Sequence, residues 1–252
     1  MQSFINKIPS FINRNPDKQP KDILSKIQNK MKVLSFPILL PPLSIPQLPD
    51  PESPLHILWN HRWEHDKDPT TFFTVLIELH DHGIPFHLSV LGQSYEETPS
   101  IFEEMHEKLK NHIIHFGFVD SKEEYYQILQ QTDICVSTSI HEFYGISVLE
   151  AANCGNYCIC PNRLSYDILL SLQSSYPEIF PREQLYNTKA QLKKLLKDLC
   201  LRPEKVRNRN KEQEKERYSK YTWSSLKPQW DSILLYVCFL YIKIIICKFH
   251  YT

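Results

Sequence analysis

The chain has no surplus of charge of either sign. Its 252 residues include 29 lysines and arginines and 29 aspartates and glutamates, so the formal net charge is zero. A protein whose affinity for nucleic acid rests on neutralising many phosphates needs an excess of cations. The balance therefore argues against a strongly basic nucleic-acid-binding protein, although it allows a local basic patch.

Glycine is scarce, and the glycine-rich phosphate motifs are missing. Only five glycines occur, and neither G-x-G-x-x-G nor G-x-x-x-x-G-K-[ST] is present. Those motifs let the backbone approach a pyrophosphate or the phosphates of a nucleotide closely. Dinucleotide binding and P-loop phosphate binding therefore have no motif support.

Regular cysteine spacing is also absent. The seven cysteines do not follow the pattern of a secreted disulfide framework. Cys158 and Cys160 alternate with apolar residues, which is typical of buried thiols in a strand. Cys154 with these two could suggest a metal site, but no second Cys or His pair follows at zinc spacing. We predict no metal and a reducing compartment, the cytoplasm, with the nucleus left open.

Neither end of the chain carries a clear targeting or membrane segment. Residues 1–7 lack the apolar core of a secretory signal peptide. Residues 233–247 are strongly apolar, but Lys243 interrupts them and they are shorter than the roughly 20 residues that a membrane helix needs. We expect a buried terminal segment or an aberrant tail, with a weak membrane anchor as the alternative.

Short apolar runs alternate with amphipathic segments from residue 55 to about residue 200. Asp68 followed by Pro69 predicts the start of a helix, and Gly83 predicts its end. The alternation predicts an α/β fold with a Rossmann-like, doubly wound parallel sheet whose ligands bind at the carboxyl ends of the strands. Strands are expected at 55–60, 86–92, 113–119, 133–138 and 156–161, and helices at about 69–82, 98–110, 121–131 and 144–155, with a helical region from Thr188.

Residues 1–54 are predicted to be irregular. Prolines cluster at residues 37–54, a density that no helix tolerates. Residues 33–36 are the one candidate for a short strand in this region.

A charged loop follows the first predicted strand, at residues 61–68. Arg62 and Lys67 stand beside a helix N-terminus, where a diphosphate would find a forked donor, a point charge and free N–H groups. The alternative is a solvated loop whose cations pair with its own acids. His61 and His65 could suggest a metal, but no third ligand is apparent.

A second polar loop follows the fourth predicted strand and leads into a helix. Glu142 and Glu150 are eight positions apart, which is roughly 12 Å along a helix. Two carboxylates at that spacing could bind two parts of an elongated ligand, such as a sugar and a ribose. Gly145 would let the backbone approach that ligand. The alternative places Glu142 in a first helical turn and Glu150 on the surface.

Together the two loops resemble the donor-binding domain of family-four GT-B glycosyltransferases. EFYGISVLE at residues 142–150 looks like that family's E-x7-E motif, and Arg62 and Lys67 fall where its diphosphate-binding arginine and lysine lie. Four longer segments are similar to the family of tRNA-queuosine mannosyltransferases, with the resemblance running over about residues 1–230: ILWNHRWEHDKDPTTFF, LSVLGQSYEETPSIF, STSIHEFYGISVLEA and YPEIFPREQLY.

The resemblance implies an activity and a place for the phosphates. A member of this family moves mannose from GDP-mannose, with retention and without a metal, to queuosine at the wobble position of tRNA-Asp. Arg62 and Lys67 would bind the diphosphate and stabilise its charge as the sugar leaves. Main-chain N–H groups near Tyr144 and Gly145 would hold the diphosphate or the sugar.

The resemblance also implies roles for the two glutamates. Glu142 would hold the donor sugar, so that Arg62, Lys67 and Glu142 form the catalytic group, and Glu150 would bind the ribose hydroxyls. The alternatives are a truncated, non-catalytic module that binds a nucleotide sugar, or another family-four glycosyltransferase.

The resemblance divides the chain into three regions and also shows departures. Residues 1–54 would be a remnant of the first domain and a proline-rich linker, residues 55–230 the nucleotide-sugar-binding domain, and residues 231–252 a tail of unknown role. We therefore expect the C-terminal half of a GT-B enzyme, truncated before it, with an extended link at 162–175. Residues 193–220 are rich in both cations and acids, which favours a solvated helical face over an RNA contact.

Overall fold

A computed structural model describes eight stretches of the chain. The chain divides into two compact units, Met1–Pro37 with Leu226–Thr252 and Ile38–Ser225. Of the link predicted at residues 162–175, all but residue 162 lies outside the described residues, as does the apolar tail beyond residue 235. The described residues are 2–14, 22–28, 30–31, 34–39, 50–95, 97–142, 144–162 and 180–235.

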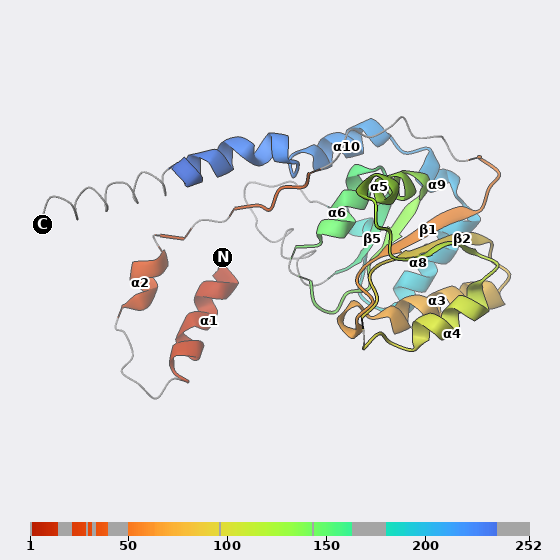
Figure 1. Ribbon diagram of the computed structural model, residues 1–252, viewed down its shortest axis with the longest axis horizontal. Helices are drawn as coiled ribbons and strands as arrows, with labels where there is room; N and C mark the ends of the chain where they lie inside the picture. The colour runs from red at the N-terminus through yellow and green to blue at the C-terminus, as the bar shows by residue number, and fades with distance from the viewer. Residues whose placement is uncertain are drawn as a thin grey trace, which may run out of the picture. The chain divides into compact units, whose positions relative to one another are not determined.

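A parallel sheet forms the centre of the second unit (Figure 1). In the described residues it has six strands in the order β3-β2-β1-β4-β5-β6. This doubly wound arrangement confirms the predicted Rossmann-like fold. The strands are β1 (Leu55–Asn60), β2 (Phe86–Leu91), β3 (Ile113–Gly117), β4 (Ile134–Val136), β5 (Tyr157–Pro161) and β6 (Leu185–Tyr186).

The strand order reverses between β1 and β4. The chain moves outward from β1 to β3 and then returns to place β4 against the other edge of β1, with Ile57 paired to Ile134. Since the strands are parallel, the loops that leave β1 and β4 start side by side. This is the switch point at which sheets of this kind bind ligands.

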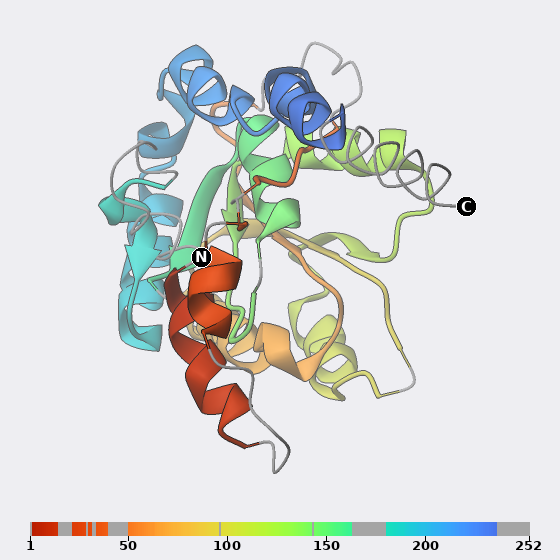
Figure 2. The ribbon, with the colours of Figure 1, turned by 90° about the vertical axis from the view of Figure 1, so that its left-hand side faces the viewer.

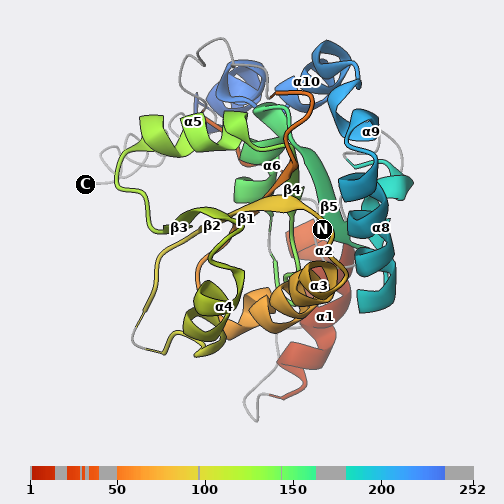
Figure 3. The same ribbon diagram turned by 90° about the vertical axis from the view of Figure 1, so that its right-hand side faces the viewer.

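Helices cover both faces of the sheet (Figure 3). One face is packed by α3 (Pro69–Asp81), α4 (Ile101–Leu109) and α8 (Lys189–Leu201). The other is packed by α5 (Lys122–Gln131), α6 (Ile146–Asn153) and α10 (Lys211–Ser219), and Figure 2 shows blue α10 beside green α6. The remaining short helices of this unit are η1 (His65–Lys67), η2 (Arg182–Gln184) and α9 (Glu204–Arg207).

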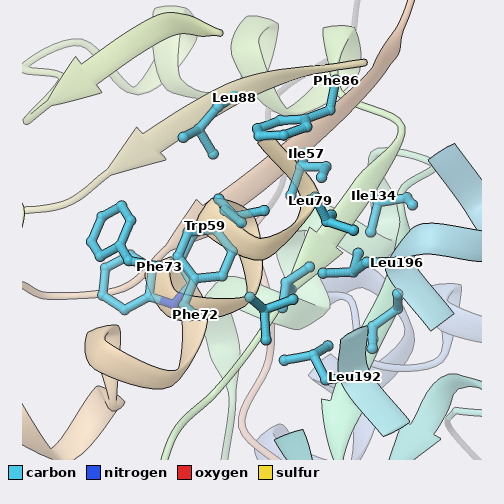
Figure 4. Packing of buried hydrophobic residues seen from close by; sticks show 14 of the residues in the cluster. Ile57, Trp59, Phe72, Phe73, Leu79, Phe86, Leu88, Ile134, Leu192 and Leu196 are labelled. Atoms are coloured by element: carbon cyan, nitrogen blue, oxygen red, sulfur yellow. The ribbon is translucent and has the colours of Figure 1, made fainter. Parts of the chain in front are cut away.

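Burial on both faces of the sheet explains why the sequences of the strands are continuous apolar runs. Side chains of β1 alternate between the faces, with Ile57 and Trp59 in the cluster under α3 and Leu58 in the cluster under α6. Phe72 stacks on Trp59 at 5.8 Å between ring centroids (Figure 4). Because both faces are covered, a strand needs no polar side.

The predicted helix ends are confirmed by their caps. Asp68 accepts a hydrogen bond from the Thr71 N–H at 3.1 Å, and Thr188 accepts one from the Gln191 N–H at 3.2 Å. Gly83, with a φ of 65°, ends α3 in the left-handed conformation that favours glycine.

The prediction that residues 1–54 are irregular is wrong for the first of them. Two helices occur there, α1 (Gln2–Ile12) and α2 (Ile23–Gln28). The proline density that excludes a helix begins only at residue 37, and the single Pro9 is accommodated inside α1. Apolar residues at helical spacing upstream of the prolines are the signal that favoured helices there.

The short strand expected at residues 33–36 is not found in its described part, residues 34–36. The pairing occurs slightly later and is a single parallel bridge between Ile38 and Thr222. Ile38 donates its N–H to the Tyr221 carbonyl at 2.8 Å and accepts one from Trp223 at 2.9 Å. Proline on its N-terminal side has no N–H to extend this ladder.

The structure describes only the first residues, 231–235, of the tail predicted at residues 231–252. Residues 223–235 are helical, which includes the first residues of the predicted tail. Over the part of the chain described, no helix is both long and apolar enough to cross a membrane.

Candidate functional site

The two loops predicted to carry chemistry meet at the switch point. The Lys67 ammonium donates to the His141 carbonyl at 2.8 Å and lies 3.4 Å from a carboxylate oxygen of Glu142. The Asp66 carbonyl accepts the N–H of Ile140 at 2.7 Å, and Thr138 donates its hydroxyl to the Lys67 carbonyl at 2.7 Å. These bonds fasten the loop after β1 to the loop after β4.

Lys67 and Glu142 form a half-buried ion pair at this junction. The exposed fraction is 9% for the Lys67 side chain and 16% for that of Glu142, and Asp66 adds a second carboxylate 3.1 Å from the ammonium. Burial opposes ionisation of Glu142, but the charge of Lys67 and the N–H of Gly145 hold its pKa below the usual value. The site therefore presents a fixed cation with a fixed carboxylate beside it.

Glu142 precedes the helix instead of lying in its first turn. Helix α6 begins at Ile146, and Gly145 caps it with a φ of 74°, a conformation that favours glycine. One Glu142 oxygen accepts the N–H of Gly145 at 3.1 Å and that of Tyr144 at 3.4 Å. The N–H groups that the resemblance assigns to a ligand are thus directed at the Glu142 carboxylate here.

Arg62 lies in the same loop as Lys67 but is far more exposed. Its side chain is 57% exposed and pairs with Glu64 at 2.8 Å. An exposed ion pair of this kind contributes at most about 1 kcal/mol, so an anionic ligand can replace Glu64 at little cost.

Glu150 lies on α6 and is held by two tyrosines of α5. Its carboxylate accepts the hydroxyl of Tyr126 at 2.7 Å and that of Tyr125 at 3.2 Å. Asn60, the last residue of β1, donates to the Tyr125 hydroxyl at 3.1 Å. No local sequence pattern singles out Tyr125, Tyr126 or Asn60, which lie 24 to 90 positions from Glu150 along the chain.

The candidate metal ligands do not converge in the described part of the chain. No group of three or more His, Cys, Asp or Glu side chains there could hold a metal ion. His61 is buried, whereas His65 is exposed. Burial raises the pKa of the Cys154 thiol to about 12 and that of Cys160 well above its usual range, which disfavours the thiolate that metals bind.

Several cations of residues 193–220 contact acids of the same chain. Lys193 lies 2.7 Å from Glu78 on α3, and Lys205 lies 2.8 Å from Asp198. The region is broken into α8, α9 and α10. Intramolecular pairing of these side chains fits a solvated helical face better than an RNA contact.

His61 is buried at the end of β1, in the middle of the site. Its ring packs edge-on against Trp59 at 5.1 Å between centroids, and its Nε2 has no hydrogen-bond partner. Burial lowers the pKa of His61 to about 4, against the opposing pull of Glu142. The ring is therefore neutral at physiological pH, and the fixed positive charge of the site comes from Lys67 and Arg62.

Two buried histidines are expected to make stability depend on pH between 7 and 5. Burial, with the nearby His87, lowers the pKa of His56 to about 4, as burial does for His61. An unfolded histidine takes up its proton near pH 6.5, while the folded groups stay neutral until about pH 4. Protonation thus favours the unfolded state as the pH falls, and each histidine should lower the free energy of unfolding by about 2 kcal/mol between pH 7 and pH 5.

Urea denaturation at the two pH values measures this dependence. Replacing His56 with glutamine, which can keep a hydrogen bond to Ser89, should remove about half of the pH effect, and so should His61→Gln. An equal free energy of unfolding for the parent at pH 7 and pH 5 would contradict the prediction.

The comparisons with known proteins identify the family. The family model described as "Glycosyl transferases group 1" matches residues 43–215. The tRNA-queuosine alpha-mannosyltransferase of Drosophila melanogaster is 36% identical over 240 residues, which are 92% of this chain and 61% of the fly protein. The chain thus spans about three fifths of the length of that curated relative.

Solved structures share the fold at low sequence identity. The pneumococcal O-GlcNAc transferase GtfA, in complex with UDP and GlcNAc, has a TM-score of 0.61 at 15% identity, covering 94% of this chain and 44% of that one. The sucrose-phosphate synthase of Thermosynechococcus elongatus has a TM-score of 0.59 at 18% identity, covering 74% and 46%.

A third structure shows which part of such enzymes this chain resembles. It is the C-terminal domain of a group 1 family glycosyl transferase from Francisella tularensis, of which 89% is covered, as is 68% of this chain, with a TM-score of 0.53 at 20% identity. The architecture is that of the C-terminal half of a GT-B glycosyltransferase. The chain belongs to the group 1 family of glycosyl transferases.

Proposed function

We propose that the chain binds GDP-mannose at the junction of the loops after β1 and β4 and serves as the donor-binding half of a retaining mannosyltransferase. The observation that carries the proposal is the Lys67–Glu142 pair, a fixed cation beside a fixed carboxylate at the switch point of the sheet. The identity to the fly enzyme supports mannose as the sugar.

The charges of the site fit the departure of a nucleoside diphosphate. Lys67 is already in place, and Arg62 is exposed beside it, so both can neutralise the charge that grows on the diphosphate as the sugar leaves. Cations fixed before the reaction stabilise that charge without the cost of reorganising water. In this proposal they do the work of a metal ion, Glu142 holds the sugar and Glu150 holds the ribose.

The acceptor in this proposal is queuosine of tRNA-Asp. Support comes from the fly relative, a tRNA-queuosine alpha-mannosyltransferase, of which this chain spans 61%. The five described cysteines form no disulfide with one another, which fits a protein of a reducing compartment, the cytoplasm or the nucleus. Binding of the donor without transfer to queuosine-containing tRNA would favour the alternative of a donor-binding module.

Calorimetric titration with GDP-mannose, with UDP-glucose as the control ligand, tests the donor. We expect preferential binding of GDP-mannose, and at least about tenfold weaker binding in Arg62→Ala and in Glu150→Ala, because each loses hydrogen bonds to or from a charged group. Lys110→Ala and Glu107→Ala are the control variants, because they remove the same kinds of charge from side chains at the end of α4 that are 65% and 75% exposed. Both should bind GDP-mannose as the parent does.

Two results would overturn the proposal. One is a folded parent that binds neither nucleotide sugar. The other is binding of GDP-mannose that is unchanged in both Arg62→Ala and Glu150→Ala, which would place the donor elsewhere.

A further inference from the structure

Two consecutive tyrosines of one helix donate to a single carboxylate of the next. The hydroxyls of Tyr125 and Tyr126 lie 3.2 Å and 2.7 Å from the two different oxygens of Glu150. Tyr126 is buried, whereas Tyr125 and Glu150 are half-buried. Each carboxylate oxygen is thus held by its own donor, which fixes both the position of the carboxylate and its plane.

The direction of every hydrogen bond in this network is determined. Asn60 has only N–H donors on its amide nitrogen, and it gives one to the Tyr125 hydroxyl at 3.1 Å and the other to the Ser147 carbonyl at 2.9 Å. The Tyr125 hydroxyl therefore accepts from Asn60 and donates to Glu150. The Tyr126 hydroxyl lies closer to Glu150 than to the Leu39 carbonyl, at 2.7 Å against 3.3 Å, and the charged oxygen is the stronger acceptor.

The electrostatics keep both phenols as donors. Burial and the charge of Glu150 raise the pKa of Tyr125 and of Tyr126 well above the usual value, so neither hydroxyl ionises near neutral pH. An ionised carboxylate offers about four acceptor positions, of which the tyrosines occupy two. Glu150 can therefore still accept two further hydrogen bonds on its exposed side.

We propose that Tyr125 and Tyr126 are positioning residues that hold the Glu150 carboxylate for a pair of vicinal ribose hydroxyls, and thereby make the site selective for ribonucleotide over dideoxyribonucleotide ligands. The inference rests on the proposed function, in which Glu150 binds the ribose. A free glutamate side chain loses rotamer freedom when it captures a ligand, whereas the carboxylate held by two phenols has already lost it.

The network also connects the two halves of the site. Asn60 ends β1 immediately before the loop of Arg62 and Lys67, and its side chain reaches α5 and the first turn of α6. The network therefore holds the Glu150 carboxylate, proposed to bind the ribose, in a fixed position relative to the loop whose cations would bind the diphosphate. A nucleoside diphosphate requires such a fixed spacing between the two parts of its site, because its ribose and its phosphates are covalently joined.

The test compares GDP with 2′,3′-dideoxy-GDP as ligands of the parent and of phenylalanine variants. We expect the parent to bind GDP at least about tenfold more tightly. Tyr126→Phe and the double variant Tyr125→Phe/Tyr126→Phe should lose about five- to tenfold in affinity for GDP while binding dideoxy-GDP as the parent does. Adding Glu150→Ala to the double variant should cost little more, since contacting residues are not additive.

A matched control separates this role from simple packing. Tyr186 is also buried and donates its hydroxyl to the Ser137 carbonyl at 2.9 Å, so Tyr186→Phe removes a comparable hydrogen bond without touching Glu150. It should leave the ratio of the GDP and dideoxy-GDP affinities unchanged. Thermal unfolding of each variant verifies that it is folded at the temperature of the titration.

The outcomes distinguish this inference from the function on which it rests. A parent that does not bind GDP overturns the proposed function and this inference with it. A parent that binds GDP without preference over dideoxy-GDP, or phenylalanine variants that weaken both ligands equally or neither, overturns only the role of the two tyrosines.

Discussion

Replacement of Arg207 by alanine is expected to lower the free energy of unfolding by about 3–5 kcal/mol. Arg207, at the end of α9, donates from Nε and from one terminal nitrogen to the two oxygens of Asp133, at 3.1 Å and 2.9 Å. The side chains are only 11% and 4% exposed. The variant would leave the Asp133 carboxylate buried and without its cation, which costs more than the pair itself contributes.

The same guanidinium fastens the segment that leads into β1. It donates to the carbonyls of Pro51, Ser53 and Pro54 at 3.0 Å, 2.9 Å and 3.2 Å. These carbonyls have few alternative donors, because a proline-containing segment offers fewer N–H groups. The central strand of the sheet starts directly after this segment, so its loss affects the whole domain.

Urea denaturation of Arg207→Ala, Arg207→Lys and Arg202→Ala provides the measurement. Lysine keeps the positive charge but lacks the forked N–H donors of the guanidinium group. The free energy of unfolding of Arg207→Lys should therefore lie between that of the alanine variant and that of the parent. Arg202 is 51% exposed and pairs with Asp198, so its replacement should change stability by less than about 1 kcal/mol. A loss below about 1 kcal/mol in Arg207→Ala would contradict the prediction.

The order of strands and helices was predictable because each element carries a local signal. Asp68 with Pro69 starts α3 and Gly83 ends it, and all three are read from positions close together in the sequence. The uniformly apolar strands indicated burial on both faces, which in turn indicated crossover helices and a parallel sheet.

Two features of the structure differ from the sequence prediction or go beyond it. Helices α1 and α2 lie upstream of the prolines that begin at residue 37, and the proline density there does not determine the conformation of the residues before it. The partners of Glu150 were missed because Tyr125, Tyr126 and Asn60 approach it only through the packing of α5 and β1 against α6. The periodicity of apolar residues in a sequence does not show which side chains of different helices and strands form hydrogen bonds with each other.

The charged loop after β1 shows why a sequence alone leaves such alternatives open. A ligand-binding loop and a loop that pairs with its own acids have the same composition. In the structure Arg62 pairs with Glu64 and Lys67 with Asp66, as the second alternative predicts, and Lys67 also reaches Glu142 in the other loop. The contact between Lys67 and Glu142 across the switch point could not be predicted from the sequence, because it depends on which strands are neighbours in the sheet.

Replacement of Gly92 by alanine is expected to weaken the binding of GDP by at least about tenfold, because the displaced loop no longer directs Arg62 at the diphosphate and a hydrogen bond to a charged group is lost. Gly92 follows β2, and a Cβ there would overlap the His61 carbonyl oxygen and lie 2.8 Å from Cδ1 of Trp63. Neither neighbour can move independently. The Trp63 ring is stacked on Phe102 at 4.2 Å between centroids, and the backbone N–H of Trp63 donates to the Gln93 carbonyl at 3.0 Å.

The displaced backbone is the one that carries Arg62, which lies between His61 and Trp63. The variant should therefore lose affinity for GDP although no side chain of the proposed site is altered, and overpacking should also cost about 1–3 kcal/mol of stability.

Gly83→Ala is the matched control for this change. Gly83 has a φ of 65°, and a Cβ there would meet no atom within 4 Å. This variant should lose about 1–2 kcal/mol of stability through backbone strain but bind GDP as the parent does. Calorimetry and urea denaturation of both variants separate the two effects. If Gly92→Ala and Gly83→Ala bound GDP equally well, the position of the Arg62 backbone would not matter to the donor, and the diphosphate would have to be held by Lys67 without it.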